Sequence, residues 1–191
     1  MKSLRLLVLA PLALLSLSAH AAGNHYFYAG AGNVSFDIKG AEDNKIYDNP
    51  SFQIGGGQYL SEHFALEGFY RYSNNEDIHS KYQIDAHQLG LSIIATTGPL
   101  GNTPLELFAR GTGAYTIVKS KDTSDGDRKS IGDDSAAAFN IGGGIQWNMN
   151  ADYWMRAEYI YNVAMSDVDL DIDKFDAPDY DGFQLSIGMR F

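Results

Sequence analysis

The chain has 191 residues, of which 45% are hydrophobic and 20% charged, so its composition is that of one folded domain rather than a disordered chain. It contains no cysteine, which excludes disulfides, thiolate metal ligands and cysteine nucleophiles. Its formal net charge of −10 argues against nucleic acid as a partner, because nucleic-acid-binding proteins present basic patches.

The first segment, residues 1–21, has the pattern of a secretory signal peptide. Two basic residues precede an apolar run over 6–17, and residues 19–21 read Ala-His-Ala, a small-x-small cleavage site. The apolar run is too short and wrongly flanked for a membrane-spanning helix. The sequence therefore predicts export of the chain and a mature domain of residues 22–191.

After the signal, apolar and polar residues alternate with a period of two, which is the pattern of strands with two different faces. In chain order the predicted strands span about 26–38, 51–60, 64–72, 84–96, 104–118, 135–147, 153–162 and 182–191. In the first strand we assign the apolar face to the even positions, which begin with Tyr26 and Tyr28. In the others the apolar sets include Phe52, Phe64, Leu89, Leu105, Phe139, Tyr153 and Phe183.

Three residues on apolar positions break this alternation. They are Gln58, Asp85 and His87. Each lies toward the end of a predicted strand. We expect them near a membrane boundary or at a local bulge.

The predicted connections alternate between short and long. Those after the second, fourth and sixth strands are short, at 61–63, 97–103 and 148–152. Those after the first, third, fifth and seventh are long, at about 39–50, 73–81, 119–134 and 163–180. Short turns at one end and long loops at the other are typical of outer-membrane barrels, whose short turns face the periplasm. The sequence therefore predicts an all-β, eight-stranded, antiparallel, up-and-down transmembrane β-barrel in the outer membrane of a Gram-negative bacterium.

Alternation alone also fits a soluble barrel or sandwich with its apolar face inward, but two observations place lipid against that face. Apart from Asp85, it carries no charged residue in the third to eighth strands, and charge at the bilayer centre costs about 2–4 kcal/mol. Aromatic residues also gather near strand ends, as in the girdles at membrane interfaces. One predicted girdle comprises Tyr26, Phe64, Trp147, Tyr153 and Phe191, and the other Phe36, Phe52, Tyr72, Tyr115, Phe139, Tyr161 and Phe183.

The polar face of the predicted strands carries both acidic and basic residues. They are Glu67, Arg71, Glu106, Arg110, Arg156, Glu158 and Arg190. The interior of an eight-stranded barrel is just wide enough for side chains to fill, and arginine suits buried carboxylate pairing. We predict a structural ion-pair network in the lumen, with a gated conduction path as the alternative. The glycine runs 55–57 and 142–144 are predicted to permit tight curvature and close packing inside.

The chain ends in alternating apolar residues with a C-terminal phenylalanine: Phe183, Leu185, Ile187, Met189 and Phe191. This ending resembles the assembly signal of bacterial outer-membrane proteins. The opening over 26–32, Tyr-Phe-Tyr-Ala-Gly-Ala-Gly, is similar to the first strand of the OmpA-type barrel domain family, and the layout is similar to its small OmpX/Ail group. The resemblance implies insertion by the barrel-assembly machinery into a membrane of lipid and lipopolysaccharide.

Most acidic residues lie in the predicted long loops. In the last loop Asp167, Asp169, Asp171 and Asp173 alternate strictly. A solvated acidic loop without a metal is the favoured interpretation of this row of carboxylates, and a site for Ca²⁺ or Mg²⁺ is the alternative.

No catalytic residue and no cofactor is predicted. The chain lacks a His-Glu-x-x-His or nucleophile-elbow motif. Asp85 with His87, and His79 with Ser80, resemble the sites of an outer-membrane protease and a lipid A deacylase only in residue type.

These observations favour a non-enzymatic role, either membrane-structural or in surface interaction. A host or surface ligand would bind the long acidic loops in an adhesion or host-defence role, because loops on a rigid scaffold are common binding sites. A narrow porin-like channel for small solutes is the alternative, and an outer-membrane lipid hydrolase or protease is the third possibility.

Overall fold

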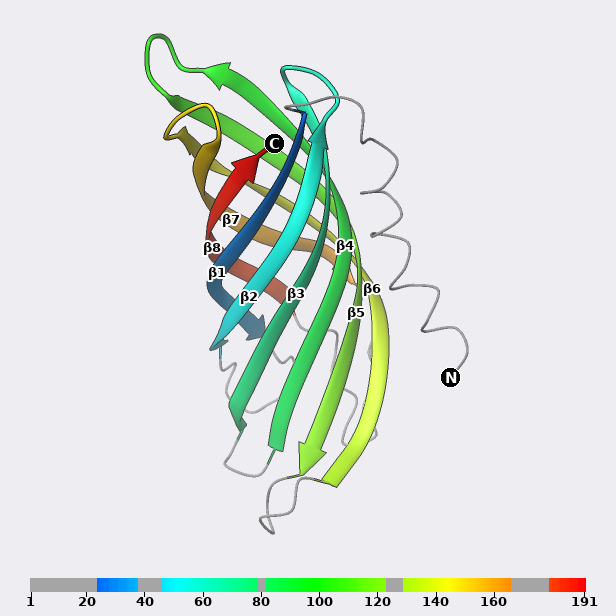
Figure 1. Ribbon diagram of the computed structural model, residues 1–191. Helices are drawn as coiled ribbons and strands as arrows, with labels where there is room; N and C mark the ends of the chain where they lie inside the picture. Colours follow the sequence, from blue (N-terminus) through cyan, green and yellow to red (C-terminus); the bar gives the residue numbers. More distant parts are fainter. Residues whose placement is uncertain (1–23, 38–45, 79–81, 123–128, 166–178) are drawn as a thin grey trace.

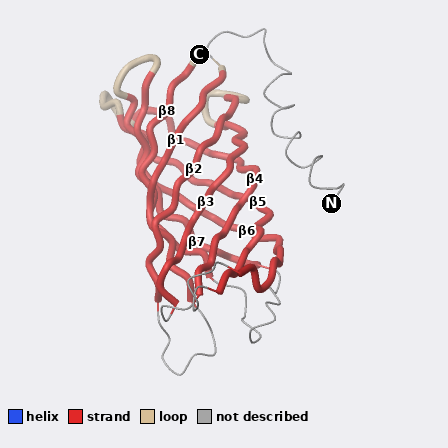
Figure 2. The backbone as a smooth tube through the Cα atoms, turned by 60° about the horizontal axis from the view of Figure 1, so that its bottom comes forward, coloured by secondary structure: helices blue, strands red, loops and turns tan. Residues whose placement is uncertain are grey.

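The computed structural model describes residues 24–37, 46–78, 82–122, 129–165 and 179–191. Strands and connecting turns make up these residues (Figure 2). The strands are β1 (His25–Asp37), β2 (Ile46–Tyr59), β3 (Phe64–Ile78), β4 (Tyr82–Pro99), β5 (Leu105–Asp122), β6 (Lys129–Asn148), β7 (Tyr153–Met165) and β8 (Asp179–Arg190). Within the described residues, no helix is long and apolar enough to span a membrane.

The eight strands form a closed antiparallel barrel in which each strand pairs with the next and β8 pairs with β1. Figure 1 shows the tilted strands around one axis, with the described turns and the C-terminus at one end. We call this the short-turn end and the opposite end the long-loop end. The predicted fold class is therefore confirmed. Closure leaves no strand edge along the body of the barrel, as a membrane-spanning sheet requires.

Several strands extend farther toward the long-loop end than the apolar pattern predicts. β3 continues to Ile78 rather than ending near 72, β5 continues to Asp122 rather than 118, and β6 begins at Lys129 rather than near 135. The ladder of β5 and β6 reaches the pair Asp122 and Lys129. The boundaries were wrong here because backbone pairing continues where outward side chains are polar, whereas the prediction followed apolar residues.

The prediction of which positions point outward and which point inward is confirmed for β2 to β8. The outward set includes Phe52, Ile54, Leu91, Ile93, Leu107, Ile141, Ile145, Leu185 and Ile187, all of them exposed. The inward set includes Gln53, Glu67, Arg71, Gln88, Arg110, Thr116, Asn140, Arg156, Glu158 and Gln184, all of them buried. The barrel is thus apolar outside and polar inside, the inverse of a soluble protein.

The assignment of faces in β1 was wrong. Tyr26 and Tyr28 are 0% and 1% exposed and lie inside the barrel, whereas Phe27 is 53% exposed on the outer face. Tyr26 is therefore not part of an aromatic girdle. The reason is volume: the rings lie over glycines of β2, where a Cβ at Gly57 would lie 2.6 Å from Tyr26 and a Cβ at Gly55 would lie 2.7 Å from Tyr28.

The other described members of the two predicted girdles are on the outer face. Phe64, Trp147, Tyr153 and Phe191 are exposed close to the short-turn end. Toward the long-loop end the outward aromatics are Phe52, Tyr72, Tyr115, Phe139, Tyr161 and Phe183. The side chain of Phe36 lies outside the described side chains.

Candidate functional site

The interior of the barrel holds a cluster of four charged side chains, which we call the lumenal ion cluster: Glu67, Arg110, Arg156 and Glu158. Arg110 Nη2 lies 2.9 Å from Glu67 Oε2, and Arg110 Nε lies 2.6 Å from Glu158 Oε1. Arg156 Nη1 lies 2.7 Å from Glu67 Oε1. All four side chains are buried, and they come from β3, β5 and β7. Two carboxylates balance two guanidinium groups, so the cluster has no net charge.

Aromatic rings pack against the lumenal ion cluster. Tyr26 donates a hydrogen bond of 2.7 Å to Glu67 Oε1. The Arg156 guanidinium lies 4.5 Å from the Trp154 ring centroid and 4.6 Å from that of Phe108, distances at which cation–π attraction operates. Sequence reasoning missed this ring layer because it assigned Tyr26 to the outer face and did not pair Trp154 with the arginines.

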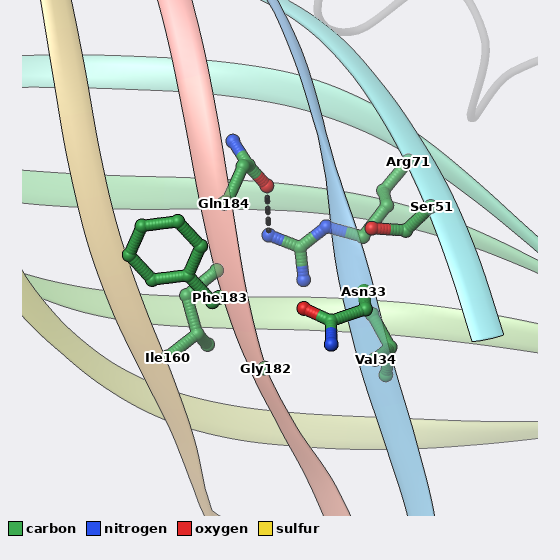
Figure 3. Close-up of a pocket in the computed structure, with 8 residues that line it drawn as sticks. All are labelled: Asn33, Val34, Ser51, Arg71, Ile160, Gly182, Phe183 and Gln184. Atoms are coloured by element: carbon green, nitrogen blue, oxygen red, sulfur yellow. Dashed lines mark hydrogen bonds between the residues drawn. The ribbon is translucent and has the colours of Figure 1, made fainter. Parts of the chain in front are cut away.

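A second level of side chains crosses the lumen on the long-loop side of the cluster. Arg71 donates to Gln53 Oε1 at 2.6 and 2.9 Å, to Gln88 Oε1 at 3.3 Å and to Gln184 Oε1 at 3.2 Å. Figure 3 shows Arg71 and Gln184 meeting beside a small pocket that is too narrow for a water molecule. These contacts join β2, β3, β4 and β8 through amide oxygens, which the arginine-to-carboxylate prediction did not anticipate.

A third level lies at the short-turn end. Arg190 donates to Tyr59 Oη at 3.2 Å and to Asn148 Oδ1, and Asn148 Nδ2 donates to Glu106 Oε1 at 2.7 Å. Thr96 donates to the second oxygen of Glu106 at 3.0 Å. Glu106 and Arg190 are therefore linked through an amide rather than in direct contact.

The structure thus distributes the seven predicted lumenal residues over three levels. Glu67, Arg110, Arg156 and Glu158 form the central cluster, Arg71 lies beyond it, and Glu106 and Arg190 lie at the short-turn end. The glutamines of the second level occupy inward positions of their strands. Alternation could therefore have identified them if uncharged polar residues had been included in the prediction. The arrangement can fix the barrel wall and fill the lumen.

The other candidate residues lie elsewhere. Asp85 accepts a hydrogen bond from Tyr72 at 3.2 Å, and His87 Nδ1 lies 2.7 Å from Tyr70 Oη, on the outer face. Asp167, Asp169, Asp171, Asp173, His79 and Ser80 lie outside the described residues. Among the residues that are described, no group of three or more His, Cys, Asp or Glu could hold a metal ion. The calcium or magnesium site in the last loop stays a prediction.

The proposed assembly signal lies along β8 and the C-terminus. Phe183, Leu185 and Ile187 are exposed on the outer face. Phe191 donates its backbone N–H to His25 O at 2.9 Å, next to the β1–β8 seam. Its role as a recognition signal for the assembly machinery stays a prediction.

A closed eight-stranded barrel with an apolar outer face and a polar, packed interior is the architecture of a transmembrane outer-membrane barrel. The chain belongs to the family described as "Outer membrane protein beta-barrel domain", whose sequence profile matches residues 7–191. Membership of this family implies location in the outer membrane. A sequence search of curated proteins gives no match.

Solved structures show the same fold at low sequence identity. Neisserial surface protein A (NspA) superposes on this chain with a TM-score of 0.71 and is 13% identical to it in sequence. The match covers 90% of this chain and 100% of the NspA chain. Ail, the attachment invasion locus protein of Yersinia pestis, has a TM-score of 0.57 and 15% identity with the same coverages, and its complex with the heparin analogue sucrose octasulfate is also similar. The N-terminal barrel domain of Pseudomonas aeruginosa OprF has a TM-score of 0.57 and 14% identity, covering 90% of this chain and 100% of that one.

Proposed function

We propose that this protein is a non-conducting, non-enzymatic outer-membrane barrel that presents its long acidic loops at the cell surface for interaction with a ligand. The observation that carries the proposal is the lumen itself. Side chains from distant strands meet across the lumen at Glu67–Arg156 (β3 and β7) and at Arg71–Gln184 (β3 and β8). At the short-turn end Arg190 and Asn148 link β8 to β6. A solute would have to break buried ion pairs to pass, so the barrel serves as a rigid support rather than a pore.

The charge of the loops indicates the kind of partner. Segment 166–178 carries five Asp against one Lys, whereas 38–45 and 123–128 each carry two acidic residues against two Lys and one Arg, respectively, so the negative charge is concentrated in the last loop. A negative surface attracts basic partners and repels acidic ones. The structure of Ail with a sulfated heparin analogue shows that a barrel of this shape can bind a surface ligand. For this chain the charge favours a basic protein surface, or a partner joined through divalent cations.

Conductance separates this proposal from the narrow porin. The refolded mature barrel is expected to produce no current steps in a planar lipid bilayer. Arg71→Ala is expected to remain silent as well, because the lumenal ion cluster still closes the barrel below it. Regular steps from the unmodified protein would contradict a non-conducting barrel and favour the porin.

Surface interaction is tested by trimming the loops. Cells expressing the intact chain are expected to bind host surfaces or survive serum better than cells with the empty vector. Shortening 39–44, 123–128 and 167–177 is expected to abolish this gain while barrel levels in the outer membrane stay equal. If intact and trimmed chains both behave like the empty vector, the interaction role is wrong.

Unchanged lipid A masses in the same cells would exclude the lipid hydrolase.

A further inference from the structure

The outer face of β3, β4 and β5 changes character in an ordered way along the barrel. Strand register aligns outward residues into rows, of which the central one is Gly68, Leu91 and Gly113. Toward the long-loop end the next rows are Tyr70, Leu89 and Tyr115, then Tyr72, His87 and Ile117, and finally Asn74, Asp85 and Lys119. Apolar residues thus give way to tyrosines and then to ionisable groups. This is the order expected from the hydrocarbon core to the head groups of a membrane.

We call the polar residues of these rows the outer polar patch: Tyr70, Tyr72, Asn74, Asp85, His87 and Lys119. Side-chain contacts join the first five, and Lys119 lies beside Asp85 in the strand register. Tyr70 Oη lies 2.7 Å from His87 Nδ1, and the Tyr72 and His87 ring centroids are 5.2 Å apart. Tyr72 donates to Asp85 at 3.2 Å, and Asn74 Nδ2 donates to Tyr72 Oη at 3.2 Å. Asn74 Oδ1 is buried without a hydrogen-bond partner among the described residues. The patch therefore holds donors and acceptors in fixed positions.

Two outward glycines of β5, Gly111 and Gly113, lie between the apolar side chains of β4 and β6 next to the outer polar patch, and we call this strip the furrow. On β5 the outward residues Gly111 and Gly113 have no side chain, and a Cβ at either would meet no atom within 4 Å. Leu91 and Ile93 of β4 stand on one side, and Phe139 and Ile141 of β6 on the other. Neither glycine has a backbone conformation that requires glycine. A larger residue would therefore fit at either position, so folding does not require the outer surface to be open here.

We propose that the outer polar patch and its furrow bind one outer-leaflet glycolipid with a phosphorylated sugar head group. Lys119 and His87 would hold the phosphate, because charge-assisted hydrogen bonds are the strong ones. Asn74 and the tyrosine hydroxyls suit sugar hydroxyls and amides, which both donate and accept, and Asp85, which is 5% exposed, accepts from Tyr72 behind them. One acyl chain fills the furrow. A phosphate alone would leave the Asp85 carboxylate as an unfavourable neighbour, so the charges favour a lipid that carries hydroxyl donors as well.

This site lies on the membrane-facing wall, apart from the loops and the lumen, and rests on the proposed orientation with the long loops outside. Its test is native mass spectrometry of the refolded mature barrel in detergent, titrated with lipid A, a phosphorylated glucosamine disaccharide lipid. One bound lipid A per barrel is expected. The double variant His87→Gln with Lys119→Gln should weaken binding about tenfold or more, because it removes the two charge-assisted hydrogen bonds to the phosphate. Gly113→Leu, which fills the furrow, should weaken it similarly.

Matched controls separate a site from general lipid adhesion. His63→Gln makes the same histidine change at the short-turn end, and Ala157→Leu adds bulk to the outer face of β7. Both should bind lipid A like the unmodified barrel. The proposal is overturned if the controls weaken binding as much as the test variants, if the test variants bind normally, if phosphatidylglycerol binds as tightly as lipid A, or if barrels associate in pairs in place of binding lipid. None of these results depends on conductance or adhesion, so the proposed function is judged separately.

Discussion

Glu67→Gln is expected to lower the free energy of unfolding by about 3–5 kcal/mol, the usual cost of removing one partner from a buried ion pair. The carboxylate is 0% exposed and bonds to Arg110, Arg156 and Tyr26 at once. Its neutral replacement leaves two guanidinium groups facing one remaining carboxylate, Glu158. The surplus positive charge is then buried in the barrel, where water cannot solvate it.

Urea unfolding in phospholipid vesicles, followed by tryptophan fluorescence, measures this change. Glu106→Gln is the matched control, since Glu106 lies at the short-turn end, is half-buried and bonds to neutral groups. Its loss should cost about 1 kcal/mol. Removing Glu67 and Arg110 together, as Glu67→Gln with Arg110→Met, restores neutrality and should cost less than the two single changes added. Equal losses for Glu67→Gln and Glu106→Gln would show that the lumenal ion cluster does not stabilise the barrel.

The charged members of this cluster could be predicted from the sequence, and their partners could not. Period-two alternation places Glu67 and Arg110 on one face, because each strand separates lipid from lumen. Which arginine meets which glutamate depends on strand register and on the stagger of the closed barrel, and neither leaves a signal in one strand. Arg71 is an example. It contacts Gln184, which is 113 positions away in the sequence, because closure of the barrel brings β3 and β8 to face the same lumen.

The error in β1 has a different physical origin. Polarity could not assign its faces, because each begins with aromatic residues and continues with small ones, glycine on one face and alanine on the other. The side-chain volume on the neighbouring strand decides: Tyr28 of β1 lies beside Gly55 of β2, and Tyr26 lies beside Gly57, in register. Pairing of a large inward ring with an inward glycine on the next strand recurs at Phe69 with Gly90 and Trp154 with Gly188. Matching glycines on one strand to aromatics on its neighbour would have assigned β1 correctly.

The same pairing predicts a large effect from one methyl group. Gly188→Ala is expected to lower the free energy of unfolding by about 1–3 kcal/mol, the usual range for overpacking. A Cβ there would lie 2.2 Å from Trp154 Cζ2, and Trp154 is fully buried among Tyr26, Tyr28 and Arg156. Circular dichroism during urea unfolding measures the change.

The source of the overpacking determines what should rescue it. At Gly188 the three nearest atoms to the added Cβ all belong to the Trp154 ring, so Gly188→Ala should cost little in a Trp154→Leu background. At Gly144 the added Cβ would lie 1.9 Å from the Ala157 carbonyl oxygen, which no side-chain change removes. Gly111→Ala, with no atom within 4 Å, should shift stability by less than about 0.5 kcal/mol. A Gly188→Ala loss that persists without the Trp154 ring would mean that strand curvature, rather than ring packing, requires glycine there.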